Sequence, residues 1–267
     1  MNTARLARWL LFTIVALMLG AGIWAPCPYD KQYREEIAAP PSHAHLLGTD
    51  AVGRDRLSRL LYGGRISLLL APAAALLSVG LALAIALGAS LSLPWQQTAA
   101  TAFIDLFLSV PWLFLLLAVR AVLPLNTAPS LSVAVTFSLL GLLGWPGPAR
   151  VMIAAANSEV RAAYVLRARA AGCGPWRLAV THIAPNLAPI AWAQFWTTAP
   201  AFLLSEVNLA LLGLGIAEPL PSWGSLMREL QNFSSIPRQP WIAVPLVVLV
   251  ITLGCSQLAW RTGDYPA

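Results

Sequence analysis

The sequence predicts an all-α protein embedded in a membrane, a polytopic bundle of six transmembrane helices. Hydrophobic residues make up 58% of the 267 residues and charged residues only 10%, and the mean hydropathy is +0.70, far from the composition of soluble domains. Apolar stretches recur at about the 20-residue length that a helix needs to cross a bilayer. Only helices and closed β-barrels satisfy the backbone polar groups in lipid. These stretches lack the alternation of barrel strands, so we expect helices.

Residues 1–25 are expected to form a cytoplasmic N-terminus and the first transmembrane helix. Two arginines precede an apolar run from Trp9 to Ala25. The alternative is a secretory signal peptide, with Cys27 as the modified residue of a lipoprotein. Pro26 disfavours it, because a small residue should precede such a cysteine, and further apolar stretches follow.

Residues 26–64 are expected to form a periplasmic segment, since charged residues of both signs are spread through them. Thr49 or Asp50 is expected to cap a short amphipathic helix at the membrane surface. In it Asp55 and Arg59 have the i,i+4 spacing of an ion pair. Its apolar side would carry Leu57, Leu60 and Leu61.

Residues 65–267 would hold the other five transmembrane helices, in the apolar stretches 66–93, 98–122, 131–156, 189–216 and 241–260. Many tryptophans fall near the ends of these stretches, as interfacial anchors do. Six crossings place both termini on one side, together with the loop at 157–187. That loop is rich in arginine and almost free of acids, so we place it and both termini in the cytoplasm.

The loop itself has a helix-turn-helix pattern. Residues 162–171 have helix-forming composition, Gly172 to Pro175 interrupt them, and a second short helix is expected from Trp176 to Ile183. Pro185 is expected to end that helix before the next span. Such a pair of helices suits insertion into a groove on another protein.

Motifs for bond chemistry are absent from the sequence. It contains no GxxxxGK[ST], no HExxH and no credible catalytic triad. Three scattered cysteines without CxxC spacing predict neither a disulfide framework nor a metal site. His43 and His45 could face one metal on an extended strand, but two histidines do not complete a site. No basic stripe indicates nucleic-acid binding. We therefore expect no enzyme and no metal.

Three motifs resemble one family. The loop sequence YVLRARAAGCG followed by HIAPN resembles the EAA-type loop of ABC-transporter permeases, in the importer branch for dipeptides, oligopeptides and nickel. Leu166, Arg167, Ala171 and Ala184 depart from the branch pattern. The matching residues that the resemblance assigns to ATPase coupling are Tyr164, Val165, Ala168, Arg169, Ala170, Gly172, His182, Pro185 and Asn186.

The two other motifs lie outside the loop. HLLGTDAVGRDRLSRLLYGGRISL at 45–68 is similar to the periplasmic signature of the branch, and LLGLGIAEPLPSWGSLM at 211–227 is similar to its FLGLGxxPPxPSWGxML segment. The signature residues carried over are Gly48, Thr49, Asp50, Gly53, Arg54, Asp55, Arg59 and Arg65.

The resemblance implies the permease subunit of an ATP-driven importer in the bacterial inner membrane. It would form a heterodimer with a second permease and take up peptides, nickel or metal-chelate-type solutes. Two ATP-binding subunits would hold ATP and Mg²⁺, so this chain would bind no cofactor. A periplasmic binding protein would dock on 26–64 and 216–238, and membrane lipid would surround the helices.

Two acids fall inside predicted spans, where ionisable groups are costly. We expect Asp105 to have a structural hydrogen bond or ion pair, and Glu206 to line the external mouth of the translocation path. The main alternative function is an ion-gradient-driven secondary transporter, which should show internal repeats that this sequence lacks. A membrane-embedded enzyme is a third possibility; it would need paired acids or histidines within the spans, and these are absent.

Overall fold

The structure is a computed structural model that describes residues 3–122, 128–232 and 236–260. Helices dominate the described residues, where the only β-type pairings are two isolated bridges, Gln32 with Arg54 and Thr49 with Asp55. The predicted all-α class is confirmed. The chain forms two compact units, one from 1–71, 120–136 and 200–267 and the other from 72–119 and 137–199.

The helices follow one another along the chain with few long connections. The α-helices are α1 (Thr3–Leu19), α2 (Ala21–Trp24), α3 (Arg56–Leu91), α4 (Pro94–Ser109), α5 (Trp112–Val122), α6 (Pro129–Leu143), α7 (Pro146–Val160), α8 (Ala163–Ala170), α9 (Pro175–Leu178), α10 (Ala184–Leu211), α11 (Trp223–Met227) and α12 (Val244–Ala259). A π-helical turn, η1 (Ala179–Ile183), joins α9 to α10, and two 3-10 turns, η2 (Arg228–Gln231) and η3 (Pro240–Ala243), precede α12.

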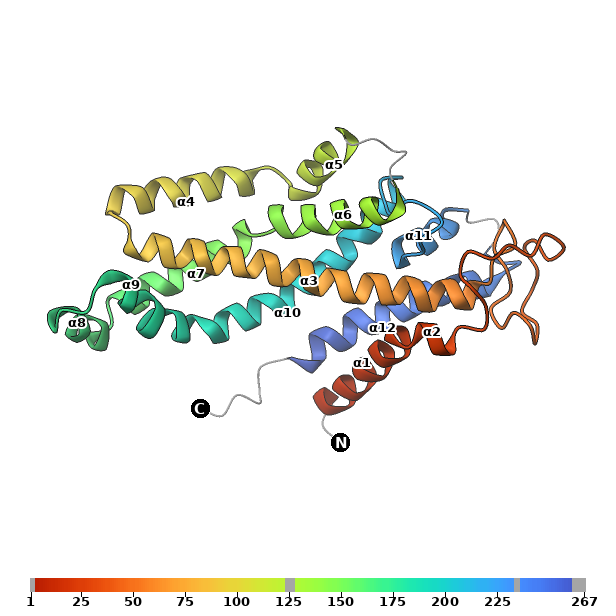
Figure 1. Ribbon diagram of the computed structural model, residues 1–267, viewed down its shortest axis with the longest axis horizontal. Coiled ribbons are helices and arrows are strands. Elements are labelled where there is room, and N and C mark those ends of the chain that lie inside the picture. The colour runs from red at the N-terminus through yellow and green to blue at the C-terminus, as the bar shows by residue number, and fades with distance from the viewer. Residues whose placement is uncertain (1–2, 123–127, 233–235, 261–267) are drawn as a thin grey trace. The chain divides into compact units, whose positions relative to one another are not determined.

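In the first unit, α1 packs along α12, and Figure 1 shows the two helices side by side. Small side chains allow the close contact: Ala7 meets Cys255 and Ala259, with Leu11 beside them. Arg8 then donates from Nε to the Ala259 carbonyl over 2.9 Å. That bond satisfies a carbonyl in the last turn of α12, which has no partner within its own helix.

In the second unit, α4 packs against α7. Arg150 on α7 forms an ion pair with Asp105 on α4, with 3.2 Å between Nη1 and Oδ1. The structural role expected for Asp105 is therefore confirmed. A small buried core of Ala156, Ile183 and Leu187 connects α7 to the turn that leads into α10.

Helix boundaries differ from the sequence expectation at three places. The short helix expected in 26–64 is the first part of α3, which begins at Arg56 and runs on for 36 residues, so the boundary at 64 falls inside a helix. The stretch 98–122 is broken between α4 and α5, and the two helices are bent by 80°. Pro111 lies at this break, where it has no N–H to donate and restricts Val110 to extended backbone.

Three described helical stretches are long and apolar enough to cross a membrane, namely 56–91, 129–160 and 240–259. The bent pair α4 and α5 makes a fourth if it is counted as one span. The expected number of six is thus not confirmed: α1 has only 17 residues, and α10, at 28 residues, carries three prolines and Glu206.

Candidate functional site

The 157–187 loop contains the expected turn, and Gly172 makes it. After α8 ends, Gly172 has φ +84°, its N–H donates to the Arg169 carbonyl, and the Cys173 N–H donates to the Ala168 carbonyl, both over 3.0 Å. This pair of bonds is the Schellman motif, which closes a helix with a left-handed residue. A Cβ on Gly172 would meet nothing within 4 Å. Glycine is therefore needed here for its backbone conformation and not for space.

The second half of the loop differs from the prediction. Pro185 does not end a helix: the helical run continues from Pro175 through η1 into α10, and Pro185 lies near the start of α10. The π-helical turn at Ala179–Ile183 comes directly before α10. Proline cannot donate the usual i→i−4 bond, and a π-helical turn is a known way to accommodate such a gap. The loop is therefore joined to α10 without a break.

Tyr164 is the centre of a polar cluster that ties α8 to α10. Its hydroxyl donates to the Glu159 carboxylate and accepts from Asn186 Nδ2 over 2.6 Å. Asn186 Nδ2 also donates to the His182 carbonyl over 2.8 Å, and the His182 ring lies 6.4 Å from the Tyr164 ring. The bond to Glu159 raises the pKa of the Tyr164 hydroxyl. Three residues assigned to ATPase coupling thus meet in one cluster.

The other assigned loop residues divide by exposure. Val165 is fully buried and anchors α8, and Ala168 is half-buried. Arg169, Ala170 and Pro185 are exposed. Leu166 and Trp176 are exposed as well. α8 and α9 therefore form a short helical hairpin (Figure 1). Val165 anchors it, and exposed apolar and basic side chains can contact a partner.

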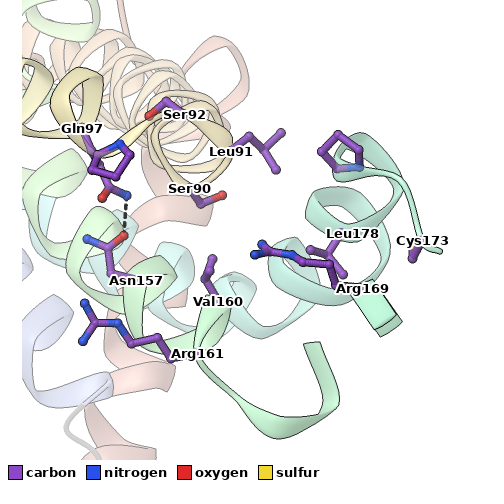
Figure 2. A pocket seen from close by; sticks show the side chains of 12 residues that line it. Ser90, Leu91, Ser92, Gln97, Asn157, Val160, Arg161, Arg169, Cys173 and Leu178 are labelled. Carbon is purple, nitrogen blue, oxygen red and sulfur yellow. Dashed lines mark hydrogen bonds between the residues drawn. The ribbon is translucent and has the colours of Figure 1, made fainter. Parts of the chain in front are cut away.

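A cavity of about 450 Å³ lies between this hairpin and the turn that joins α3 to α4. Gln97 closes one side by donating from Nε2 to Asn157 Oδ1 over 2.6 Å, and Figure 2 shows Arg169 extending from the loop toward Val160. Arg161 also lines the cavity. The cavity therefore separates the hairpin from the α3–α4 turn on this side.

The 45–68 signature forms the second candidate site, on the first unit. Gly48 and Gly53 both have positive φ, and a Cβ at either would lie 2.3 Å from a carbonyl oxygen, of Ala39 or Tyr33. Between these turns Thr49 is fully buried; its hydroxyl donates to the Glu36 carbonyl and accepts from the Ala39 N–H. The two glycines and Thr49 therefore build a tightly folded loop.

Thr49 or Asp50 was expected from the sequence to cap α3, and that expectation is wrong. The N-cap of α3 is Asp55. Its Oδ2 accepts from the Ser58 N–H over 2.7 Å, the bond that an N-cap side chain makes. Its Oδ1 lies 2.8 Å from His45 Nδ1, and His45 Nε2 lies 3.3 Å from Glu36. Among the described residues, no group of three His, Cys, Asp or Glu side chains could hold a metal ion.

The expected Asp55–Arg59 ion pair is wrong, because Asp55 is occupied by His45 and the α3 cap. Arg59 instead binds Glu218, with 2.9 Å from Nη2 to Oε1. Arg54 joins the same network, donating to Asp50 Oδ2 over 2.7 Å and to Glu218 Oε2 over 2.5 Å. Nothing in the local sequence singles out Glu218, which stands where the family pattern has proline. Arg65 is exposed on α3 and joins no contact of this network in the described part of the chain.

The 211–227 motif packs directly on the signature. The Trp223 N–H donates to Ser67 Oγ over 3.2 Å, and its ring Nε1 donates to the Leu60 carbonyl over 3.3 Å. Ser67 Oγ and the Gly224 N–H both bind Glu206, at 3.4 and 3.3 Å. Glu206 is fully buried. The two motifs therefore form one folded region.

Arg120 is a candidate that sequence reasoning missed. It is 2% exposed, and it donates to the carbonyls of Leu214 and Gly215 and to the Ser132 hydroxyl. The signal was available, since Arg120 is a charge within an apolar stretch, where an ionisable residue needs a partner. Its partners belong to the LGLG sequence at 212–215 and to α6. Only the fold brings these two segments close to Arg120.

Together these observations define a helical membrane component that presents a braced two-helix loop and a separately folded, charge-rich segment. The family model of the binding-protein-dependent transport system inner membrane component matches residues 78–259. The chain belongs to this family, and it is a multi-pass permease of an ABC importer of the peptide branch, as the resemblance indicated.

Three relatives support the branch. The chain is 31% identical to the di/tripeptide transport system permease protein of Pseudomonas aeruginosa, over 91% of this chain and 82% of the relative. It is 31% identical to the oligopeptide transport system permease protein of Mycobacterium bovis, over 98% and 86%. A putative peptide permease of Brucella suis is 29% identical, over 87% and 75%.

Proposed function

We propose that this chain is one of two permease subunits of an importer that takes up short peptides with energy from ATP hydrolysis by partner subunits. The support for the cargo is that the relatives similar along most of the chain are permeases for di/tripeptides and oligopeptides. Nickel and metal chelates are the weaker possibility, since these relatives are named as permeases for peptides. ATP and Mg²⁺ belong to the partner ATPases.

The observation that carries the coupling role is the way the 157–187 loop is fastened. α8 is tied to α10 by the Asn186–Tyr164 bond, and α9 is joined to α10 by an unbroken helical run from Pro175. A force applied to the exposed face of α8 and α9 therefore reaches α10 through hydrogen bonds and a continuous backbone. We assign this loop to the groove of a cytoplasmic ATPase, which places both termini in the cytoplasm as well.

The 26–64 segment and the 216–238 region would lie on the opposite, periplasmic side and receive the binding protein. Glu206 belongs to this side. Its buried carboxylate accepts hydrogen bonds from Ser67 and Gly224. We therefore propose that Glu206 shapes the external mouth of the translocation path by holding the 212–224 segment in place. Normal substrate-stimulated ATPase activity and uptake in Glu206→Gln would argue against that role.

The experiment is reconstitution of this chain with its partner permease, ATPases and binding protein in proteoliposomes. ATP-dependent uptake of a radiolabelled tripeptide, absent when ATP or the binding protein is left out, is the expected result. Accumulation of ⁶³Ni²⁺ in place of peptide would contradict the cargo, and uptake driven by an ion gradient without ATP would contradict the mechanism.

A further inference from the structure

A cavity of about 490 Å³ opens on the first unit, between the 38–59 region and the residues that follow the LGLG motif. Its lining is strongly charged. Four arginines reach it, namely Arg54, Arg56, Arg59 and Arg228, against the three carboxylates Asp50, Glu218 and Glu229. One positive charge is in excess, and this excess favours an anionic occupant.

Two of the four arginines have partners apart from Glu218. Arg56 binds Glu229 and the Thr49 carbonyl, and Arg228 donates to the Ala210 carbonyl over 2.6 Å. Arg228 is exposed and adds positive charge to the cavity, but in the described part of the chain it shares no carboxylate that could be exchanged. The arginines that share such a carboxylate are Arg54 and Arg59, which both bind Glu218.

Arg59 has donors to spare. Its side chain is 2% exposed, yet among the described residues its Nε and Nη1 have no hydrogen-bond partner. The nearest carboxylate oxygen to Nε, Asp50 Oδ2, is 3.8 Å away, which is too far for a hydrogen bond. A buried guanidinium with unused N–H groups is costly, and it gains from a second carboxylate.

Glu218 is the more exposed carboxylate of this network. Its side chain is 50% exposed, whereas those of Arg59 and Asp50 are 2% and 3% exposed. It belongs to the segment between α10 and α11, outside any helix. Glu218 can therefore leave the two arginines at little cost in packing, provided that another carboxylate takes its place and keeps the buried charge balanced.

We propose that Arg54 and Arg59 are the receptor for an acidic side chain of the extracytoplasmic substrate-binding protein, and that Glu218 holds this place until the binding protein docks. The inference rests on the proposed function, because it needs a binding protein on this side. Exchange of one carboxylate for another leaves the buried arginines paired in both states. It would make docking reversible and dependent on a matching acidic residue.

The test uses the complete transporter in lipid nanodiscs and its cognate binding protein, with the dissociation constant measured by biolayer interferometry. Glu218→Gln removes the internal competitor but keeps the side-chain shape. Because a charge-assisted bond is then released for the partner, we expect binding about tenfold tighter. Asp105→Asn removes the charge of an acid whose side chain is 51% exposed and which lies outside 26–64 and 216–238, so it should leave the dissociation constant unchanged.

A second measurement does not depend on the folding of Glu218→Gln. Each surface Asp and Glu of the binding protein is replaced by its amide, and at least one replacement should weaken binding to the wild-type transporter about tenfold. That effect should vanish when the transporter carries Arg54→Gln, as a double-mutant cycle requires of a direct pair.

The possible outcomes distinguish failure of the docking inference from failure of the proposed function. Binding that is unchanged or weaker in Glu218→Gln, or that becomes tighter to the same extent in Asp105→Asn, overturns the inference and leaves the proposed function intact. A wild-type transporter that binds no binding protein overturns both. Stabilisation of the transporter by free tripeptide alone, lost in Arg54→Gln, overturns the inference in favour of a substrate carboxylate in the same cavity.

Discussion

The side-chain amide of Asn186 donates a hydrogen bond to the hydroxyl of Tyr164 over 2.6 Å, although 22 residues separate them in the chain. The bond connects the start of α8 to the first turn of α10. Asn186 also holds the His182 carbonyl, in the π-helical turn between them. One amide therefore fastens the 157–187 loop to the helix that it is proposed to move.

Replacement of Asn186 by leucine should uncouple transport from ATP hydrolysis. It removes both hydrogen bonds at similar side-chain volume, so the loop can shift without carrying α10 with it. We expect peptide uptake per ATP hydrolysed to fall several-fold, at normal membrane insertion, in proteoliposomes assayed for both quantities. Thr181→Val removes only a local bond to the Arg177 carbonyl and should keep the normal ratio. An unchanged ratio in Asn186→Leu would show that the bond transmits nothing.

Replacement of Gly172 by valine should have a similar effect through the backbone. With φ at +84°, a β-branched residue is disfavoured by about 1–2 kcal/mol, which opens the Schellman turn and separates α8 from α9. We expect uptake to be lost while the chain still inserts and assembles, as measured by copurification of its partners. Gly174 has φ −65° and an open surrounding, so Gly174→Ala is the matched control. Retained transport in Gly172→Val would contradict the role of the turn.

Replacement of Arg120 by leucine should destabilise the first unit. The carbonyls of Leu214 and Gly215 and the Ser132 hydroxyl lose a charged donor while they remain enclosed. We expect a loss of about 2–3 kcal/mol in the free energy of unfolding, seen as a lower Tm of the purified transporter. The control is Arg150→Gln, whose ion pair with Asp105 is more than half exposed on both sides, and a pair of that kind contributes little. Equal Tm values for the two variants would exclude a bracing role for Arg120.

Replacement of Gly224 by alanine should be more harmful than the added methyl group suggests. An ideal Cβ would lie 2.6 Å from Glu206 Oε1 and 2.7 Å from the Ala210 Cβ, so α11 must move away from α10. We expect a cost of about 1–3 kcal/mol from such overpacking, again read from the Tm. Gly80, inside α3, has nothing within 4 Å of its Cβ position, and Gly80→Ala should be neutral or slightly stabilising.

Tyr33 gives the 26–64 segment a distinct alkaline behaviour. Its hydroxyl donates to Cys27 Sγ over 3.1 Å, and this bond, with burial, raises its pKa from 10.0 to about 12. A raised pKa means that the contribution to stability is complete below the ordinary value and is lost as the pH rises through the folded value. At about pH 11 Tyr33 should still be protonated, so Tyr33→Phe should leave the absorbance change of tyrosine ionisation at 295 nm unchanged. A smaller change in the variant would show that Tyr33 titrates normally.

Much of the architecture follows from local sequence. Composition alone requires helices in lipid, because no other element satisfies the backbone there. The turn at Gly172 was predictable too, since a glycine after a run of helix-forming residues marks a C-terminus. By contrast, the ends of the helices around Pro111 and Pro185 were not. A proline shows where an i→i−4 bond is lost, but whether the chain then bends, as between α4 and α5, or absorbs the gap in a π-helical turn depends on what packs against it.

The sequence by itself determined that this chain is a helical membrane permease, and which motifs carry its contacts, because apolar length and turn-forming residues act locally. Only the tertiary structure decided the partners of the charged residues. Asp55 caps α3 and binds His45, Arg59 turns to Glu218, 159 residues away, and Arg120 reaches the LGLG carbonyls. Charged side chains are long and accept many partners, so their pairing is set by which segments the fold brings within hydrogen-bond distance, and spacing along one helix does not reveal it.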